Sequence, residues 1–203
     1  MNKFRYYFVN GITLYRMMVA PLLVFLIFSR QLDLFKWLFG FSFFTDVLDG
    51  WLARKYKVAS KLGARLDSIA DDLTIVAGIT GVIVLKPDFF KQEMALIVFL
   101  LILFLIQTIL AFIRYGKISS FHTYAAKLSA LFQGFFLILL FFLHEPVYIL
   151  FYTAVFVTTV DLIEEIILVL LLPEWETNVK SLYWVMKRKK NAGTTVDYKQ
   201  QSQ

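Results

Sequence analysis

Six apolar stretches, each close to the length of a membrane-spanning helix, limit the folds open to this chain. A spanning helix needs about 20 mostly apolar residues. By that measure the predicted spans are residues 12–29, 34–53, 67–85, 94–113, 126–143 and 148–172. With 59% hydrophobic and only 18% charged residues, the composition is more apolar than that of ordinary soluble domains. We therefore expect an all-α integral membrane protein with about six transmembrane helices.

The positive charges of the chain indicate its topology. Lys and Arg are concentrated near the N-terminus, in residues 54–66 and 114–123, and in the "MKRKK" run near the C-terminus. Because cytoplasmic loops carry an excess of these residues, we expect both termini and both loops in the cytoplasm, with the protein in the inner membrane of a bacterium. The net charge of +6 suits anionic membrane lipids. Nucleic acid is not indicated, since the cations are not interleaved with exposed aromatic residues on a soluble surface.

The chain contains one predicted domain and a tail. Residues 1–186 include all the apolar stretches and form the membrane domain. Residues 187–203, "KRKKNAGTTVDYKQQSQ", are polar and without periodicity, which predicts a disordered, basic tail. The segments "FRYYFVN" and "WETNVKSLYW" mix aromatic and polar residues, as is typical of the membrane interface.

Four aspartates lie where two predicted spans approach the cytoplasm. Asp46 and Asp49 are three residues apart, and Asp67 and Asp71 are four apart, so each pair shares one face of a helix. If the intervening residues fold the two spans into a hairpin, all four carboxylates meet in a polar cavity that faces the cytoplasm. Hard divalent cations prefer such oxygen ligands. The pattern therefore predicts metal-assisted chemistry on a phosphate ester at the membrane surface.

A structural explanation of these aspartates has to be weighed as well. Asp67 and Asp71 are near the start of a span, where a carboxylate can cap a helix or interact with its dipole. Asp46 and Asp49 precede the C-terminal end of a span, where negative charge is unfavourable, although ion pairs with Arg54 or its neighbours remain an alternative. Because carboxylates within membrane segments are usually functional, we favour the metal site.

The same aspartates belong to a longer pattern with fixed spacing. The string Asp46-x2-Asp49-Gly50-x2-Ala53-Arg54-x8-Gly63-x3-Asp67-x3-Asp71 resembles the signature of the CDP-alcohol phosphatidyltransferases, without a gap or a substitution. The segment "NGITLYR" (residues 10–16) is similar to the N-terminal segment of that family, and the six predicted spans agree with its architecture. The resemblance therefore covers nearly all of the membrane part.

The resemblance implies an activity and a set of roles. Enzymes of this family join a CDP-linked lipid, usually CDP-diacylglycerol, to an alcohol and release CMP. By analogy, one or two Mg²⁺ or Mn²⁺ ions are held by Asp46, Asp49, Asp67 and Asp71. Asp71 is in addition the general base that takes the proton of the acceptor hydroxyl. The residues implied to bind the CDP moiety are Asn10, Thr13, Gly50, Ala53, Arg54, Ser60 and Gly63.

The acceptor side is less clearly indicated. Cationic and polar residues near the cytoplasmic face are candidates to bind an acceptor alcohol, in particular a phosphorylated one; they are Arg16, Arg114, Lys117, His122 and Lys127. Arg16 is equally consistent with snorkelling to the interface, and Arg114 and Lys117 with a basic loop that only sets topology. Glycerol-3-phosphate is the leading prediction for the acceptor, which implies a phosphatidylglycerophosphate synthase. Inositol phosphate, serine and phosphatidylglycerol (as in a cardiolipin-type synthase) are the alternatives.

Three acidic residues in the last span have no counterpart in the signature. Asp161, Glu164 and Glu165 lie near the middle of the 148–172 span, three and four residues apart, and face the interior by this spacing. Candidate partners are Arg114 and Lys127. A transporter or a non-catalytic lipid-binding scaffold are the competing classes of function. The charged residues cluster on one side, which disfavours a transporter, and no signature position is missing. The resemblance also implies a homodimer.

Overall fold

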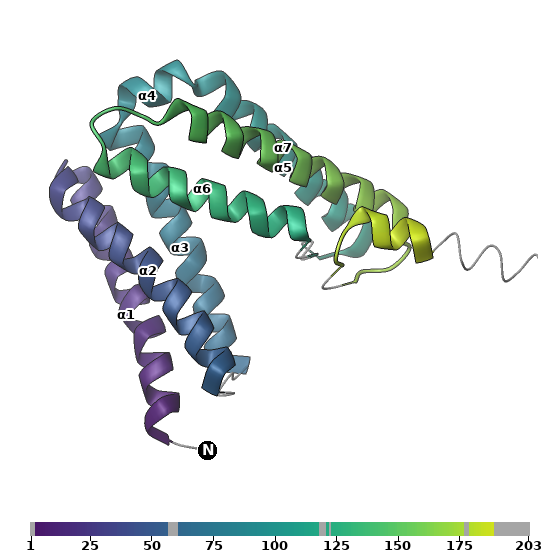
Figure 1. The fold of residues 1–203 in the computed structure, drawn as a ribbon, viewed down its shortest axis with the longest axis horizontal. Helices are drawn as coiled ribbons and strands as arrows, with labels where there is room; N and C mark the ends of the chain where they lie inside the picture. Colours follow the sequence, from purple (N-terminus) through teal and green to yellow (C-terminus); the bar gives the residue numbers. More distant parts are fainter. Residues whose placement is uncertain (1–2, 57–60, 118–120, 122, 177–178, 189–203) are drawn as a thin grey trace, which may run out of the picture. The chain divides into compact units, whose positions relative to one another are not determined.

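The computed structural model describes residues 3–56, 61–117, 121, 123–176 and 179–188, and within them the side chains of residues 3–10, 12, 13, 46–56, 61–69, 71 and 72 are outside the description. All regular structure in these ranges is helical (Figure 1). The helices are α1 (Lys3–Phe28), α2 (Leu32–Tyr56), α3 (Lys61–Leu85), α4 (Pro87–Gln92), α5 (Met94–Tyr115), α6 (Tyr124–Phe142) and α7 (Tyr148–Leu171).

Each predicted span corresponds to one long helix, but α1, α2 and α3 extend clearly beyond the apolar stretch. α1 begins at Lys3 and α3 at Lys61, before the predicted starts at 12 and 67, and α2 ends at Tyr56 instead of 53. Hydropathy marks only the part of a helix that suits lipid, whereas backbone hydrogen bonding continues into polar residues. The interfacial segment "FRYYFVN" is accordingly part of α1.

The sequence analysis did not predict α4, which occupies the polar break after α3. Pro87 stands at its first position, where the missing N–H of proline costs nothing. A further helical turn covers residues 182–188 and crosses the predicted start of the tail at residue 187. Residues 189–203, the rest of the predicted tail, are outside the described residues.

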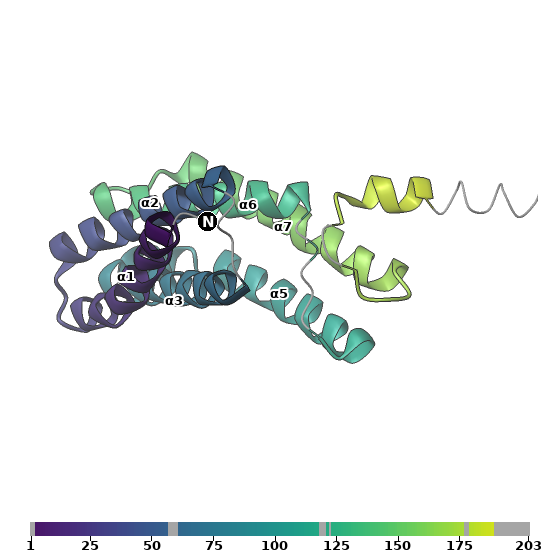
Figure 2. The same cartoon turned by 90° about the horizontal axis from the view of Figure 1, so that it is seen from below.

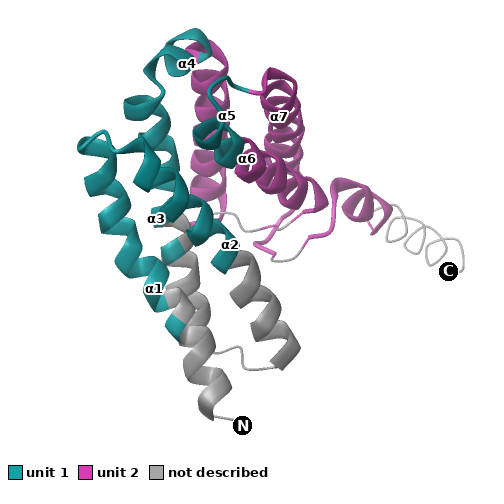
Figure 3. Cartoon of the chain, turned by 60° about the vertical axis from the view of Figure 1, so that its left-hand side comes forward, with its two compact units in different colours: residues 1–93, 137–146 teal, residues 94–136, 147–203 magenta. Residues whose placement is uncertain are grey.

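The chain divides into two compact units (Figure 3). Unit 1 consists of residues 1–93 and 137–146, and therefore of α1 to α4 and the end of α6. Unit 2 consists of residues 94–136 and 147–203, and therefore of α5, most of α6, α7 and the C-terminal segment.

In unit 1, α1 packs against both α2 and α3, as two views show (Figures 1 and 2). Aromatic rings form the centre of this unit. Phe35 stacks on Phe39 with 5.4 Å between ring centroids and meets Phe141 edge-on at 4.8 Å. α3 approaches these rings closely because it carries glycine there: a methyl group at Gly81 would lie 2.9 Å from Phe35 Cζ. Substituting Gly81 would therefore require the rings to move.

In unit 2, α5 runs alongside α7, and the C-terminal segment completes their core (Figure 1). Buried side chains from four parts of this unit make one cluster; they are Ala111, Phe121, Leu168, Val169, Leu172, Val179 and Val185. Since Val179 and Val185 follow α7 in the chain, the C-terminal segment folds back onto the helix pair instead of leaving it.

Two described helices are long and apolar enough to cross a membrane. They are α5 and α6. Only 11% of the most apolar stretch of α5, and 28% of that of α6, is buried by the rest of the chain. Large apolar side chains such as Phe104, Phe112 and Ile113 are therefore exposed along α5. An exposed apolar surface of this extent is expected of a helix that contacts lipid.

Candidate functional site

The signature residues are distributed over α2 and α3, the two helices that flank residues 57–60. Asp46 and Asp49 belong to the last turns of α2, and Asp67 and Asp71 to the first turns of α3. Their side chains are outside the described residues, as are those predicted to bind CDP: Asn10 and Thr13 on α1, Gly50, Ala53 and Arg54 on α2, and Gly63 on α3. Ser60 is outside them entirely.

The described half of α2 fixes which face of this helix is the inner one. Phe39, Ser42 and Thr45 are buried there, at spacings of three residues. Positions 46 and 49 continue the same stripe, since each is three or four residues further along the helix. The hydroxyl of Thr45 donates to the carbonyl of Phe41, 3.0 Å away, so the polar group of Thr45 is satisfied within its own helix.

α3 shows a similar arrangement, but here the signature aspartates lie at the start of the helix instead of at its end. Ala70, Thr74 and Ala77 are buried, and Thr74 Oγ1 donates to the carbonyl of Ala70 at 2.8 Å. Positions 67 and 71 lie three residues before Ala70 and Thr74 and so belong to the same helix face. Both signature pairs therefore extend the faces through which α2 and α3 pack inside unit 1.

Arg16 is the described acceptor candidate in unit 1, and it is buried. Its side chain is 2% exposed and belongs to the α1 face that also buries Val19, Ala20 and Leu23. The structure thus favours an interior position over snorkelling to the interface. A buried guanidinium is costly unless it meets acceptors or an anion.

The remaining acceptor candidates belong to unit 2. Arg114 Nε donates to the carbonyl of Leu172 at 3.1 Å, at the C-terminal end of α7, and Lys117 Nζ lies 4.8 Å from the centre of the Trp175 ring. Lys127 is exposed, with Nζ 5.6 Å from the Tyr124 ring. His122 is outside the described residues. Arg114 and Lys117 therefore have partners in the C-terminal half of their own unit.

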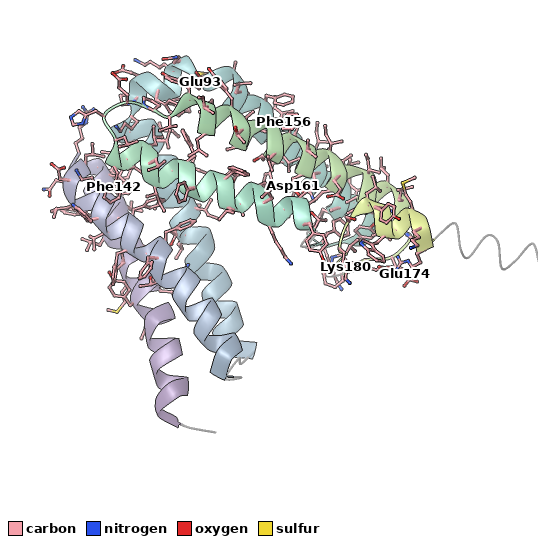
Figure 4. The ribbon with its side chains drawn as sticks, in the orientation of Figure 1. Glu93, Phe142, Phe156, Asp161, Glu174 and Lys180 are labelled. Carbon is pink, nitrogen blue, oxygen red and sulfur yellow. The ribbon has the colours of Figure 1, made fainter. Side chains whose placement is uncertain are left out.

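Asp161 on α7 accepts hydrogen bonds from the start of α6. Ser129 Oγ donates to Asp161 Oδ2 at 2.8 Å, and Thr123 Oγ1 donates to Asp161 Oδ1 at 3.4 Å. The same Thr123 oxygen accepts the backbone N–H of Ala126 at 3.0 Å and thereby caps α6. Asp161, which is 7% exposed and is labelled in Figure 4, thus holds the capping residue of a neighbouring helix in place.

Glu164 connects α7 to the C-terminal segment. Its Oε1 atom accepts the backbone N–H of Leu182 at 2.7 Å. The backbone N–H of Tyr124 donates to the carbonyl of Lys180 at 3.1 Å, so the same segment also contacts the start of α6. The partners that the structure gives Asp161 and Glu164 are hydroxyl and amide groups, whereas the sequence had suggested Arg114 and Lys127. Sequence analysis missed this network because hydroxyls and backbone amides leave no charge pattern.

The donor set in the signature suits a divalent metal ion. Four carboxylates and no softer ligand are what Mg²⁺ and Mn²⁺ prefer. The polar side of α2 begins one turn earlier with Ser42, which is 1% exposed and whose Oγ has no hydrogen-bond partner among the described residues. Among the described side chains, no three His, Cys, Asp or Glu residues gather as a ligand set. The acids of α7 are therefore not arranged as a second metal site.

Comparison with known proteins identifies the family. The CDP-alcohol phosphatidyltransferase family matches residues 7–160, well over half of the 203-residue chain, and this range contains the whole signature. The chain belongs to the CDP-alcohol phosphatidyltransferase family. It is accordingly a transferase of phospholipid synthesis, associated with the membrane.

Individual relatives point to two acceptor classes. A CDP-diacylglycerol–glycerol-3-phosphate 3-phosphatidyltransferase from Rickettsia typhi is 32% identical over 129 residues, which cover 62% of this chain and 71% of that protein. The protein of the same name from Rickettsia prowazekii is 32% identical, with 62% and 70% covered. A CDP-diacylglycerol–inositol 3-phosphatidyltransferase from Saccharomyces cerevisiae is 39% identical over 66 residues, or 32% and 30% of the two chains. No solved structure gives a significant match.

Proposed function

We propose that this phosphatidyltransferase transfers the phosphatidyl group of CDP-diacylglycerol to glycerol-3-phosphate and releases CMP. The observation that carries the proposal is the complete signature on α2 and α3, at the ends of faces that pack inside unit 1. The acceptor follows from the two Rickettsia relatives, which bear the name of this reaction and match well over half of both chains.

The donor site, in this proposal, forms around the ends of α2 and α3 that flank residues 57–60. Gly50 and Ala53 are one turn apart on α2 and lack bulk, so a nucleotide can approach the helix backbone there. Arg54 follows directly and supplies positive charge for the pyrophosphate. Asn10, Thr13, Ser60 and Gly63 complete the contacts to CDP. Together with the four aspartates they line a polar cavity that opens to the cytoplasm.

The reaction replaces a phosphoanhydride bond with a phosphate ester bond. The hydroxyl oxygen of the acceptor attacks the phosphorus that carries the diacylglycerol, the pyrophosphate bond to CMP breaks, and the hydroxyl proton passes to the carboxylate of Asp71. A neutral alcohol is a poor nucleophile, and a carboxylate base at hydrogen-bond distance raises its reactivity. Arg54 stabilises the negative charge that CMP gains as it leaves.

Asp46, Asp49, Asp67 and Asp71 would hold one or two Mg²⁺ or Mn²⁺ ions. When bound, such ions neutralise the pyrophosphate and the charge that develops during phosphoryl transfer. The four carboxylates alone would repel one another, which is a further reason to expect a cation among them.

On the acceptor side, a second phosphate has to be recognised. Arg16 is buried inside unit 1, where a guanidinium is expected to meet an anion. We propose that this phosphate is bound by a cationic group of one unit: Arg16 in unit 1 is the first candidate, and the basic and polar residues of unit 2 are the alternative, namely Arg114, Lys117, His122 and Lys127.

The membrane arrangement completes the proposal. Besides α5 and α6, we propose that α1, α2, α3 and α7 also cross the bilayer, which makes six spans with both termini in the cytoplasm. Residues 1–186 would be the membrane domain of an inner-membrane protein, followed by a polar tail, and the functional form would be a homodimer. The long helices and their exposed apolar side chains support the six spans.

The reaction can be tested by measuring CMP release. Purified protein is incubated with CDP-diacylglycerol and Mg²⁺ or Mn²⁺, and each acceptor is supplied separately: glycerol-3-phosphate, inositol phosphate, serine, inositol and phosphatidylglycerol. The expected result is CMP release that requires glycerol-3-phosphate and metal and is lost in Asp71→Asn. CMP release without any acceptor would indicate hydrolysis instead and would overturn the proposal.

Inositol is the second candidate acceptor, on one specific observation. The Saccharomyces cerevisiae relative has a higher identity than the Rickettsia proteins, although over about a third of each chain. If CMP release requires inositol and is indifferent to glycerol-3-phosphate, this candidate replaces the first.

A further inference from the structure

The C-terminal segment of unit 2 exposes aromatic side chains beyond the end of α7. Tyr183 is 65% exposed and Trp184 49%, and the apolar, non-aromatic side chain of Met186 is 58% exposed. Trp175, 37% exposed, lies a few residues after Leu171, where α7 ends. Large aromatic residues are costly to expose to water, so their concentration in one short segment needs an explanation.

Lysine side chains accompany these indole rings. Lys180 Nζ lies 5.4 Å and Lys187 Nζ 5.6 Å from the centre of the Trp184 ring, and Lys117 Nζ lies 4.8 Å from that of Trp175. All three lysines are exposed. An indole attracts an ammonium group but carries no formal charge. The rings therefore do not neutralise the lysines, which can still bind an anion.

One of the two nearby glutamates forms an ion pair with an arginine. Glu176 forms a two-pronged ion pair with Arg188, whose Nη2 lies 2.9 Å from Glu176 Oε1. The negative charge of Glu174 is then outnumbered by the positive charges of the three lysines. Figure 4 shows Glu174 and Lys180 at the end of unit 2 where α7 stops. The ion pair also brings the two indoles to one end of unit 2, because Glu176 follows Trp175 and Arg188 follows Lys187. We name the basic surface around these indoles the lysine–indole patch; it consists of Lys117, Trp175, Lys180, Trp184 and Lys187.

The patch is held in a fixed position by the folded part of unit 2. Val179 and Val185 are 7% and 3% exposed and belong to the core cluster with Leu168 and Val169. The hydrogen bonds from Leu182 N to Glu164 and from Tyr124 N to the Lys180 carbonyl fix the backbone between them. One side of the segment is thus buried against α5 and α7, and the other presents indoles and lysines outward.

We propose that the lysine–indole patch binds the anionic headgroups of the lipid layer that surrounds α5. Trp residues are enriched at the level of the headgroups, where one part of the ring is apolar and the other is wet. Lysines near a membrane surface are attracted to acidic lipids. Lys117 follows the end of α5 at Tyr115 by two residues, which places the patch where this apolar helix leaves the bilayer.

The alternative occupants fit less well. A soluble phosphate would need a site that surrounds it, whereas the three lysines are exposed and spread over two rings. A protein partner would be expected to cover a larger apolar area without lysines at its centre. The binding of anionic lipid by this patch does not depend on the proposed reaction or on its acceptor.

The test compares lipid affinities of the complete chain. Detergent-solubilised protein is titrated with phosphatidylglycerol or with phosphatidylcholine, and the bound lipid is counted by native mass spectrometry. The parent is compared with Lys180→Gln/Lys187→Gln. A charge-matched control, Arg30→Gln/Lys91→Gln, removes two exposed cations from unit 1. Soluble glycerol phosphate is added as a competitor in a separate titration.

The expected result is preferential binding of phosphatidylglycerol that weakens about fivefold for each lysine removed, since one basic residue near the surface contributes ~1 kcal/mol. The control variant should bind as the parent does, and soluble glycerol phosphate should not compete. Equal affinity of the parent for both lipids, or an unchanged affinity in Lys180→Gln/Lys187→Gln, would overturn the proposal. Competition by glycerol phosphate would do so as well and would indicate a soluble anion.

Loss of the folded segment has to be separated from loss of lipid binding. Trp184→Phe keeps both lysines and the buried valines but removes the indole. We expect the thermal unfolding temperature in detergent to be unchanged, and the preference for phosphatidylglycerol to persist with a weaker total affinity. A patch that served only to stabilise the fold would give the opposite result, a lower unfolding temperature with unchanged lipid binding.

Discussion

The two units each place acidic residues within long helices, but they treat the charge differently. On α7 in unit 2, Asp161 and Glu164 accept hydrogen bonds from hydroxyl and amide donors of their own unit. On α2 and α3 in unit 1, Asp46, Asp49 and Asp71 belong to a family signature, and the helix faces that they extend are lined by Thr45 and Thr74, whose hydroxyls bond within their own helices.

The difference shows that an acidic residue in an apolar helix is not sufficient evidence of a catalytic site. A carboxylate in such surroundings is costly unless it is paired or hydrogen-bonded. α7 meets this requirement with neutral donors, which makes Asp161 and Glu164 connectors between helices. For the signature aspartates we propose that metal ions and substrate meet it. Substitutions should therefore change stability in one unit and catalysis in the other.

The largest effect is expected for Asp71→Asn. The amide retains the shape of the side chain but cannot take the acceptor proton, and removal of a general base costs about 10²–10⁴-fold in rate. CMP release should fall by that factor, whereas the unfolding temperature of the detergent-solubilised protein should change little. The matched control is Asp72→Asn, which removes the adjacent carboxylate outside the signature. Equal losses in both variants would mean that charge on α3, and not the base, had been measured.

A loss of stability is expected for Asp161→Ala. Thr123 would lose its acceptor, and Ser129 would keep only the carbonyl of Ala126, 3.0 Å away. A hydrogen bond to a charged group contributes about 1.5–3 kcal/mol. A double-mutant cycle with Ser129→Ala, measured by chemical unfolding, should give a coupling energy on the order of 1 kcal/mol. Asp161→Asn keeps an acceptor oxygen and should lose less.

One outcome would contradict the distinction between structural acids in unit 2 and catalytic acids in unit 1. If Asp161→Ala retains the stability of the parent but loses CMP release, Asp161 acts with the signature aspartates and not as a connector. A modest rise of the acceptor KM with unchanged kcat would be compatible with a connector, because Asp161 positions the start of α6, on which Lys127 lies.

A smaller effect is expected for Glu164, because one neutral donor is involved. Glu164→Ala removes the acceptor of the Leu182 amide, and a hydrogen bond of this kind contributes roughly 1 kcal/mol or somewhat more. Glu164→Gln retains a carbonyl oxygen for the same amide and is the matched control. We expect proteolysis within the C-terminal segment to accelerate in Glu164→Ala and not in Glu164→Gln. Equal acceleration in both variants would show that the charge, and not the hydrogen bond, holds the segment.

The sequence predicted the existence of the long helices well because each apolar stretch is long enough to form one. Each of the six spans has its helix, with boundaries that differ most where the helix continues beyond the apolar stretch, as at Lys3, Tyr56 and Lys61. The all-α class and the family also followed from the sequence, since the signature depends on spacing alone. The metal ions, the residue roles and the six-span arrangement stay predictions.

Other features could not be predicted because they depend on contacts between distant residues. Nothing in the pattern around Asp161 indicates Ser129, and nothing around Glu164 indicates the amide of Leu182. The burial of Val179 and Val185 likewise depends on a core that forms only when α5 and α7 pack together. For the same reason, the sequence offered Arg114 and Lys127 as candidate partners of the α7 acids, whereas the partners that the structure gives Asp161 and Glu164 are hydroxyl and amide groups.

The smallest effect concerns a cation, Lys86 in unit 1, which follows α3. Its ammonium donates to the carbonyl of Leu143 at 3.0 Å, and burial, together with nearby Lys36, lowers its pKa from the ordinary value of 10.5. The folded state thus binds this proton less tightly than the unfolded state. Stability should therefore rise with pH in the window between the lowered pKa and 10.5, and stay constant below that window.

Lys86→Met isolates this contribution because methionine does not titrate. The difference in unfolding temperature between parent and variant is measured from neutral pH up to about 10, near the ordinary pKa of lysine, and should shift in favour of the parent at the alkaline end. Lys36→Gln removes the second cause of the lowered pKa and should reduce the shift without abolishing it. The contradicting outcome is a difference in unfolding temperature that stays constant with pH or shifts in favour of the variant. Either result would mean that the hydrogen bond to the Leu143 carbonyl offsets the effect of burial on the ammonium group of Lys86 fully. Lys86 would then resemble Asp161 and Glu164 on α7, which accept hydrogen bonds from groups of their own unit.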